Sequence, residues 1–239
     1  MIPKKIFQSY YSDELPIELM ENVEKLKQLN PTWTHVLFND VKQEEYIKEH
    51  YDAEMLNIYL SIDPLYGAAR SDLFRYLLLY NEGGVWLDIK SSLTKPLDNV
   101  LLDTDEYILS HWDSRMAICG MHKEITEVSG IDATEYVQFF IISSPKHTYL
   151  KSVIRNVVKK IKEYNDTDVT LDRVGAKGVL SLTGPIIYTN VIYRKKDNVS
   201  HREVCHKKDL GIVYSIYKYM DHRKLFKNHY SLQTIPIIR

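Results

Sequence analysis

Apolar positions along the chain follow two alternating periods, one typical of strands and the other of helices. Short apolar runs predict strands at 5–10, 33–38, 85–89, 106–112 and 136–142. Helical spacing predicts helices at 15–28, 43–62 with a break near Tyr51, 63–81 and 146–164, and a short helix that opens at Thr183. Past Arg194 the pattern predicts short strands and turns. This order predicts an α/β fold, a Rossmann-like and mostly parallel central sheet flanked by helices.

Charged residues interrupt the apolar pattern of the predicted helix 63–81. Asp72 and Arg75 lie three residues apart, so both project from one face of that helix. Because a charge against apolar surface is costly unless it is paired, this face predicts a ligand site. An Asp–Arg pair on a surface helix is the plainer alternative.

The predicted strand 85–89 carries a second pair of charges. Period-two alternation places its three apolar residues on one face, and Trp86, Asp88 and Lys90 on the other, with Asp88 near the carboxyl end. Ligands of α/β sheets bind at that end. Gly83 fits the left-handed conformation that ends many helices. The helix face and the strand end are therefore expected to converge on one pocket.

The run YGAARSDLFRYLLLYNEGGVWLDIKSSLTKPLD at 66–98 resembles the signature block of the family 32 glycosyltransferases. It is also similar to glycosylating toxins and to the yeast α-1,6-mannosyltransferases. The family pattern S-D-x-x-R-Y, Y-G-G-x-Y-x-D-x-D and P-L appears here as Ser71-Asp72, Arg75-Tyr76, Gly83-Gly84, Trp86, Asp88 and Pro96-Leu97. The segments IPKKIFQSYY and WTHVLFND resemble the family's first two strands. Beyond residue 150 the resemblance fades.

This resemblance implies a GT-A fold over residues 1–239, with a donor-binding part at 1–150 and an acceptor-side part with the C-terminal closure at 151–239. It implies a nucleoside diphosphate sugar as donor, a glycan or glycoconjugate acceptor and retention at the anomeric carbon. Asp72 would hydrogen-bond ribose or sugar hydroxyls, Arg75 would contact the donor sugar or order Asp72, and Trp86 would pack near the nucleotide. Phe7 and Gln8 join the donor-binding set.

Three further candidates come from outside the signature block. Gln138, seven residues before Pro145, stands where the family often has Asn and is included among the catalytic residues, although an ordinary polar strand residue is the plainer interpretation. The cluster at 111–113 could line the acceptor side or simply begin a loop. His229 is the nearest C-terminal candidate for a metal ligand, and a lone histidine is more often a packed or surface residue.

The chain departs from the family at the second acid of D-x-D, which is Lys90. Mg²⁺ and Mn²⁺ prefer oxygen ligands, and an ammonium group cannot supply one. In one interpretation, Lys90 itself neutralises the diphosphate. In the other, a metal binds through Asp88, His229 and phosphate oxygens while Lys90 points aside. A third is that the site has lost catalysis and only binds a nucleotide or sugar.

The composition of the whole chain excludes several other classes of function. A formal net charge of −1 argues against nucleic acid as a partner. A nucleotidyl- or phosphotransferase would require more basic residues near the first strand than Lys4 and Lys5. Cys119 and Cys205 are too far apart for a zinc site and are expected to be buried free thiols. No apolar leader or spanning stretch is present, which predicts a cytoplasmic protein and leaves peripheral association with a membrane, and the oligomeric state, open.

Overall fold

A computed structural model describes residues 1–112, 134–164, 173–218 and 230–239. Its main sheet has six strands in the order β2-β1-β3-β6-β5-β7. These are β1 (Lys5–Ser9), β2 (Thr34–Phe38), β3 (Gly84–Leu87), β5 (Tyr107–Leu109), β6 (Phe140–Ser143) and β7 (Arg202–Glu203). β1 pairs in parallel with β2 and β3, and β5 with β7, whereas β6 runs antiparallel to β3 and β5. The predicted mostly parallel α/β sheet is confirmed.

Helices and a small second sheet surround these strands. The α-helices are α1 (Ile17–Leu29), α2 (Asp40–His50), α3 (Ala53–Ser61), α4 (Gly67–Glu82), α6 (Thr148–Lys162), α7 (Gly175–Leu182) and α8 (Pro185–Tyr193). Short 3-10 helices are η1 (Pro64–Tyr66), η2 (Leu97–Asn99), η4 (Lys196–Asn198) and η6 (Tyr230–Leu232). β4 (Ser92–Leu93) and β8 (Ile212–Val213) pair antiparallel in a two-stranded sheet.

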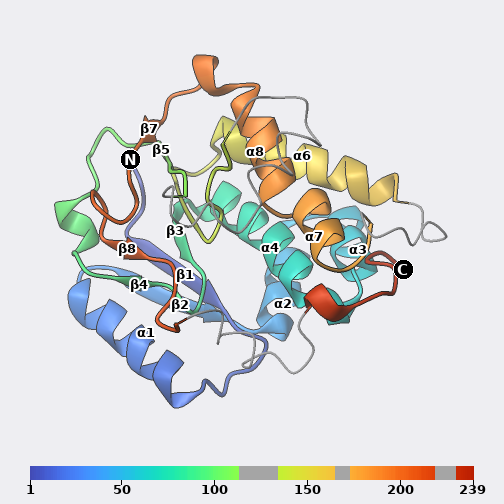
Figure 1. The fold of residues 1–239 in the computed structure, drawn as a ribbon, viewed down its shortest axis with the longest axis horizontal. Helices are drawn as coiled ribbons and strands as arrows, with labels where there is room; N and C mark the ends of the chain where they lie inside the picture. Colours follow the sequence, from blue (N-terminus) through green and yellow to red (C-terminus); the bar gives the residue numbers. More distant parts are fainter. Residues whose placement is uncertain (113–133, 165–172, 219–229) are drawn as a thin grey trace.

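The alternation of side chains along the strands separates two cores. Phe7, Trp86 and Ile141 face the core shared with α2, α3, α4, α6, α7 and α8. Val85 and Ile142 face the opposite core, which is closed by α1 and by the β4–β8 sheet. Figure 1 shows this arrangement, with α1 on one side of the main sheet and the larger group of helices on the other. The face alternation predicted for the third strand is confirmed for Val85, Trp86 and Leu87 only, because the strand ends at Leu87.

Helix α4 crosses the centre of the larger core. Every residue from Asp72 to Leu79 is buried, so this helix exposes no polar face along its middle. It ends at Glu82, and the next residue, Gly83, has a φ of +62° and a ψ of −166°, a region that only glycine adopts readily. The predicted positive φ is confirmed, but the conformation is extended rather than the left-handed helical one. The chain thereby turns directly into β3.

Several boundaries differ from the prediction for local reasons. The break near Tyr51 is confirmed, but α2 begins at Asp40 because the Asn39 side chain accepts a hydrogen bond from the Lys42 amide. β3 ends at Leu87, two residues early, because the Ser91 amide donates to the Asp88 carbonyl and closes a turn. Asp88 and Lys90 therefore lie in this turn and not on the strand.

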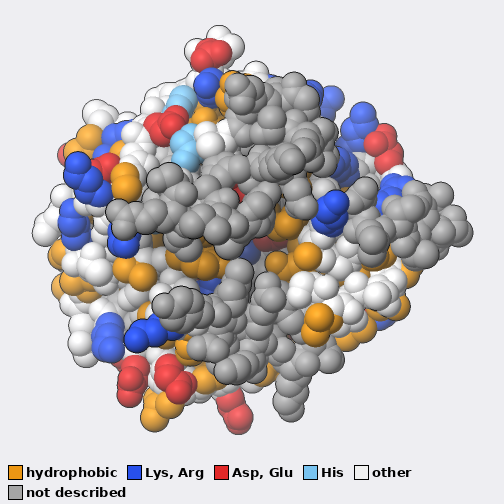
Figure 2. All heavy atoms as spheres, viewed as in Figure 1, with side chains coloured by type: hydrophobic (Ala, Val, Ile, Leu, Met, Phe, Trp, Pro, Cys, Tyr) orange, Lys and Arg blue, Asp and Glu red, His pale blue; other side chains and the backbone are white. Residues whose placement is uncertain are grey.

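Charge is distributed without a dominant sign. Figure 2 shows Lys and Arg side chains interspersed with Asp and Glu over the visible face. This agrees with the formal net charge of −1 for the whole sequence. Among the helices of the described residues, none has both the length and the apolar character needed to cross a membrane.

Candidate active site

Four charged side chains meet where α4 passes the end of β3. On α4, Arg75 Nη2 lies 3.0 Å from Asp72 Oδ1. In the turn after β3, Asp88 Oδ1 lies 3.2 Å from Arg75 Nη1 and Asp88 Oδ2 lies 2.9 Å from Lys90 Nζ. The helix face and the strand end thus converge as the sequence predicts. We call these four residues the charged cluster.

Burial and pairing set the protonation of the charged cluster. Burial raises the pKa of Asp72 to about 6, because Arg75 and Thr183 only partly offset the loss of water around this carboxyl. For Asp88, burial also acts to raise the pKa, but Lys90 and Arg75 together hold it below its usual value. Negative and positive groups therefore alternate along the cluster, from Asp72 through Arg75 and Asp88 to Lys90.

Asp72 is held by groups from the later half of the chain. Thr183 Oγ1 donates to Asp72 Oδ2 at 2.9 Å, and Gln138 Nε2 donates to Asp72 Oδ1 at 3.3 Å. Gln138 Nε2 also donates to the Tyr76 hydroxyl, and the backbone carbonyl of Gln138 accepts from Arg75 Nη1 at 2.9 Å. Gln138 therefore bridges both members of the helix pair. Thr183 and Tyr76 were not predicted as site residues.

The first strand supports the turn that carries Asp88. Gln8 is fully buried, and its Nε2 donates to the Asp88 carbonyl at 3.2 Å while its Oε1 lies 2.8 Å from His35 Nε2. The Phe7 ring instead belongs to the larger core. Trp86 is 1% exposed, with Arg75 Cζ 5.1 Å from its ring centre. Gln8 and Trp86 border the charged cluster, and Phe7 does not reach it through any recorded contact of the described residues.

Lys90 is fixed from the opposite side by the C-terminal part of the chain. Its Nζ lies 4.7 Å from the centre of the Tyr214 ring, and its carbonyl accepts from the Ile216 amide at 2.9 Å. Its side chain is only 14% exposed. Tyr214 has no local signal in the sequence, because it follows a two-residue strand far along the chain.

A divalent cation does not fit the described residues. Both oxygens of Asp88 already face cations, and Lys90 points at Asp88 instead of aside. Within the described residues no group of three or more His, Cys, Asp and Glu side chains is placed to hold a metal ion. His229, the predicted partner of Asp88, lies outside the described residues.

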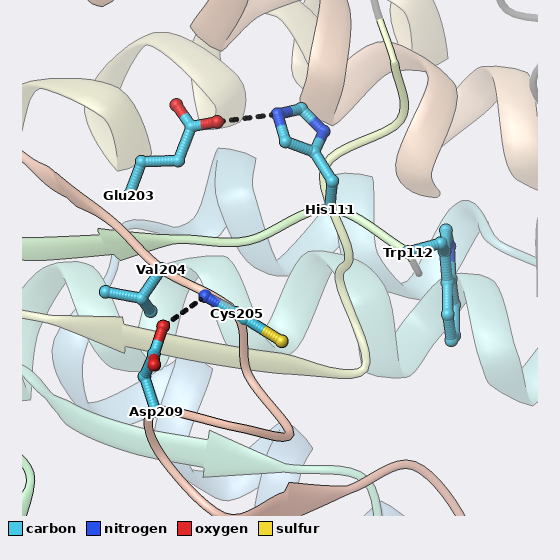
Figure 3. A pocket seen from close by; sticks show the side chains of 6 residues that line it. All are labelled: His111, Trp112, Glu203, Val204, Cys205 and Asp209. Atoms are coloured by element: carbon cyan, nitrogen blue, oxygen red, sulfur yellow. Dashed lines mark hydrogen bonds and ion pairs between the residues drawn. The ribbon is translucent and has the colours of Figure 1, made fainter. Parts of the chain in front are cut away.

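A hollow of about 450 Å³ lies at the carboxyl ends of β5 and β7 (Figure 3). It is lined by His111, Trp112, Glu203, Val204, Cys205 and Asp209. His111 Nε2 lies 2.9 Å from Glu203 Oε1. Cys205 is exposed, which corrects the expectation of a buried thiol. Cys119, and Asp113 of the predicted acceptor cluster, lie outside the described residues.

The hollow and the charged cluster share one edge of the main sheet. β3 runs antiparallel to β6, β6 runs antiparallel to β5, and β5 is parallel to β7, so the carboxyl ends of β3, β5 and β7 meet at that edge. The Trp112 and Tyr214 ring centres lie 5.0 Å apart, and Tyr214 in turn contacts Lys90. One aromatic ring therefore separates Trp112 from the charged cluster.

Similar solved structures identify the fold class. The chain superimposes on the PaToxG glycosyltransferase with a TM-score of 0.57 at 15% identity, covering 81% of this chain and 70% of that one. It superimposes on the UDP-bound glycosyltransferase domain of the YGT toxin with a TM-score of 0.54 at 9% identity, covering 90% and 81%. The fold is the GT-A fold of glycosyltransferases, as predicted.

Part of the sequence matches a family model. Residues 16–108 match the family described as the glycosyltransferase sugar-binding region containing a DXD motif. The predicted resemblance is thereby confirmed, and the matched region contains Asp72, Arg75, Asp88 and Lys90. It ends before Gln138 and Thr183.

Relatives in yeasts match from about two fifths to about four fifths of the chain. The mannosyl phosphorylinositol ceramide synthase CSH1 of Saccharomyces cerevisiae is 30% identical over 101 residues, which are 42% of this chain and 26% of that protein. The initiation-specific alpha-1,6-mannosyltransferase of Candida albicans is 23% identical over 220 residues, 82% of this chain and 54% of that protein. The chain thus spans about half the length, or less, of these relatives.

Proposed function

We propose that this protein is a retaining glycosyltransferase, which moves a sugar from a nucleoside diphosphate sugar to a hydroxyl group of a glycan or glycoconjugate. The observation that carries the proposal is the charged cluster, built at the carboxyl edge of a GT-A sheet inside the matched sugar-binding region. Ligands of α/β sheets bind at this edge. The UDP-bound toxin domain of the same fold supports a nucleotide sugar as donor.

The buried pair on α4 is assigned to the sugar end of the donor. Asp72, held by Thr183 and Gln138, accepts hydrogen bonds from ribose or sugar hydroxyls. Arg75, fixed between Asp72 and Asp88, orders both carboxylates and has no freedom to swing into solvent. Side chains locked by their neighbours in this way can orient a reacting group without further loss of entropy.

The transfer itself needs stabilisation of the leaving diphosphate. The bond between the anomeric carbon and the β-phosphate oxygen breaks, and its electron pair stays on the diphosphate. The acceptor oxygen forms the new bond on the same face of the sugar, and its proton leaves with the diphosphate. Fixed positive charge beside the departing oxygen lowers the barrier.

The hollow at the ends of β5 and β7 is assigned to the acceptor. It pairs an aromatic ring, Trp112, with the carboxylates of Glu203 and Asp209, and such groups suit the apolar face and the hydroxyls of a sugar. Its place beside Tyr214 sets an acceptor next to the charged cluster. Most of these residues belong to the part of the chain predicted to carry the acceptor side.

The test is donor hydrolysis and transfer by purified protein across a panel of nucleotide sugars. The panel includes GDP-mannose, because the relatives are named as mannosyltransferases, and UDP-sugars, because of the UDP-bound toxin domain. Turnover of one donor is expected, with loss of turnover in Asp72→Ala and no change in Asp103→Asn, an exposed carboxyl elsewhere. The anomeric configuration of the product by NMR tests retention, and inversion would contradict it.

A nucleotide- or sugar-binding protein of the same fold without catalysis is the second candidate, because Lys90 replaces an acid of the motif. Calorimetric binding of a donor without any sugar release, across the whole panel, would favour it. Absence of both binding and turnover for every donor would overturn the two proposals together.

We also propose a cytoplasmic location, from the sequence expectation alone. Peripheral attachment to a membrane remains compatible with this location. Fractionation of cells that express the protein, with a salt wash of the membrane pellet, distinguishes the soluble form from a peripherally bound one. Recovery only in a detergent-extracted pellet would contradict both.

A further inference from the structure

Lys90 occupies the position at which the family motif has a metal-binding acid. In the motif, two acids face one cation, whereas here Asp88 and Lys90 face each other at 2.9 Å. Replacing a carboxylate by an ammonium group changes the charge of the cluster by two units. That is the charge that one Mg²⁺ or Mn²⁺ ion would bring.

The ammonium group of Lys90 is held in place and charged. Its nitrogen contacts Asp88 Oδ2 and the face of the Tyr214 ring. The Lys90 carbonyl accepts a hydrogen bond from the Ile216 amide, which holds the backbone. Burial acts to lower its pKa, but Asp88 and Tyr214 more than offset this, so the pKa lies above its usual value. An ammonium group carries three N–H donors. Among the described residues its Nζ donates one hydrogen bond, to Asp88, and lies over the Tyr214 ring, so a phosphate oxygen can also accept from it.

Asp88 cannot easily serve a metal in this arrangement. Its second oxygen is engaged by Arg75 at 3.2 Å, so a divalent ion would have to displace two cations from one carboxylate. Breaking buried ion pairs to admit a further cation costs free energy, because it leaves buried charges without partners. The same contacts make Asp88 a positioning residue that orients Lys90.

We propose that Lys90 is a built-in counter-ion for the donor diphosphate, so that the protein binds its nucleotide without a divalent cation. This rests on the proposed nucleotide-sugar donor and goes beyond it. Lys90 contributes a charge-assisted hydrogen bond to the bound diphosphate and stabilises the negative charge that grows on it when the sugar leaves. Lys90 stays protonated throughout, and no proton is transferred from it.

The experiment measures nucleotide affinity by calorimetry, with UDP and GDP as probes, in excess EDTA and in excess Mn²⁺. For the wild type, the Kd is expected to change by less than about twofold between the two conditions. Lys90→Gln is expected to weaken binding about tenfold or more in both, since it removes a charge-assisted hydrogen bond. Lys25→Gln, an exposed lysine on α1, is the matched control and should bind as the wild type does.

Lys90→Asp restores the two-acid motif and gives the reciprocal test. We expect weak binding in EDTA and a recovery of about tenfold or more in Mn²⁺, the charge that the substitution removed now being supplied by the metal. Thermal unfolding provides a readout independent of nucleotide, because Mn²⁺ alone should raise the Tm of Lys90→Asp and leave that of the wild type unchanged.

The outcomes separate this proposal from the proposed function. Wild-type binding that disappears in EDTA and returns with Mn²⁺ would overturn the role of Lys90 and leave the glycosyltransferase proposal intact. Equal affinity of Lys90→Gln and wild type would also overturn it. No binding of either nucleotide to the wild type under any condition, together with no turnover of any donor, would overturn the proposed function itself.

Discussion

At the scale of single residues, Asp72 combines deep burial with contacts to both halves of the chain. Its raised pKa of about 6 means that acidification from neutral pH protonates it in the folded protein. The proton weakens the pair with Arg75 and, in the proposed role of Asp72, removes an acceptor for donor hydroxyls. Asp88, whose pKa is held low by Lys90 and Arg75, stays ionised over the same range.

We therefore expect affinity for an intact nucleotide sugar to fall about tenfold between pH 7 and pH 5, if the ionised Asp72 is the binding form. An intact nucleotide sugar is the right probe because its diphosphate does not titrate in this range. In Asp72→Asn the affinity should be weaker and nearly flat with pH. A wild-type profile without a fall in affinity would contradict this role of Asp72.

Glu135 gives a second pH-dependent prediction, for stability. Burial raises its pKa to about 7, while Trp112 Nε1 donates to its Oε1 at 2.8 Å, and its Oε2 has no hydrogen-bond partner among the described residues. The pKa of Glu135 is higher in the folded protein than in the unfolded chain. The contribution of Glu135 to the free energy of unfolding is therefore complete below its unfolded pKa and is lost as pH rises through 7. Glu135→Gln should remove that loss, about 1–3 kcal/mol between pH 5 and pH 8.

Thermal unfolding of the wild type and Glu135→Gln at several pH values measures this difference. The variant keeps the shape of the side chain and an oxygen for Trp112, so the two proteins should agree at pH 5 and diverge at pH 8. A constant difference in Tm across the range would contradict titration of Glu135 as its cause.

The site could be predicted from the sequence only as far as it is local. Asp72, Arg75, Asp88 and Lys90 lie within nineteen positions of one another, so helical spacing and the strand end sufficed to bring them together. Thr183 meets Asp72 across 111 positions, which is too far along the chain for helical spacing or strand alternation to pair them. The contact between Tyr214 and Lys90 could not be predicted either, because these residues also lie far apart along the chain.

At the scale of elements, the junction between α4 and β3 fixes the geometry of the charged cluster. A Cβ on Gly83 would lie 2.7 Å from Cδ of Pro145 and 2.9 Å from Cδ of Pro3, in a backbone region that side chains rarely adopt. Alanine there strains the turn that sets α4 against β3. Displacement of this turn would separate Arg75 from Asp88.

We expect Gly83→Ala to destabilise the protein by about 2 kcal/mol or more, from backbone strain and overpacking. Gly67→Ala, at the start of the same helix, is the matched control. Gly67 has an ordinary helical φ of −51° and open space around its Cβ position, so alanine should stabilise by about 0.5–1 kcal/mol. Urea unfolding compares them, and similar effects from both substitutions would refute the assigned strain.

Element type followed from the sequence more reliably than element faces and ends. In α1, the apolar residues Ile17 and Met20 are 62% and 50% exposed, whereas Leu19 between them is fully buried. Periodicity alone does not tell which side of a helix meets the sheet. The end of β3 is set by the turn at Asp88, which depends on a hydrogen bond and not on hydrophobicity.

At the scale of the whole molecule, the C-terminal residues return to the segment that opens α4. The Asp63 amide donates to the Ile237 carbonyl at 2.8 Å, and Arg239 Nε donates to Asp63 Oδ2 at 2.6 Å. The Tyr66 hydroxyl donates to the Ile235 carbonyl at 2.7 Å. The last residues therefore stabilise the start of the helix that carries Asp72 and Arg75.

We expect Ile237→Ala, which truncates a fully buried side chain, to cost about 2–5 kcal/mol of the free energy of unfolding. Leu232→Ala, at a side chain that is 78% exposed, should stay within about 0.5 kcal/mol of the wild type. The prediction of one domain over residues 1–239 adds that urea unfolding is a single transition by fluorescence and by circular dichroism. Two separated transitions would contradict one cooperative unit.

The ion pair between Lys90 and Asp88 has a consequence for how the protein depends on the cell's supply of metal ions. A protein that carries this positive charge in its own chain acquires it during synthesis, in fixed stoichiometry, and does not compete with other proteins for scarce manganese or magnesium. Under metal starvation its site stays as charged as under abundance. Cells deprived of manganese should keep its product at the usual level while products of D-x-D enzymes decline.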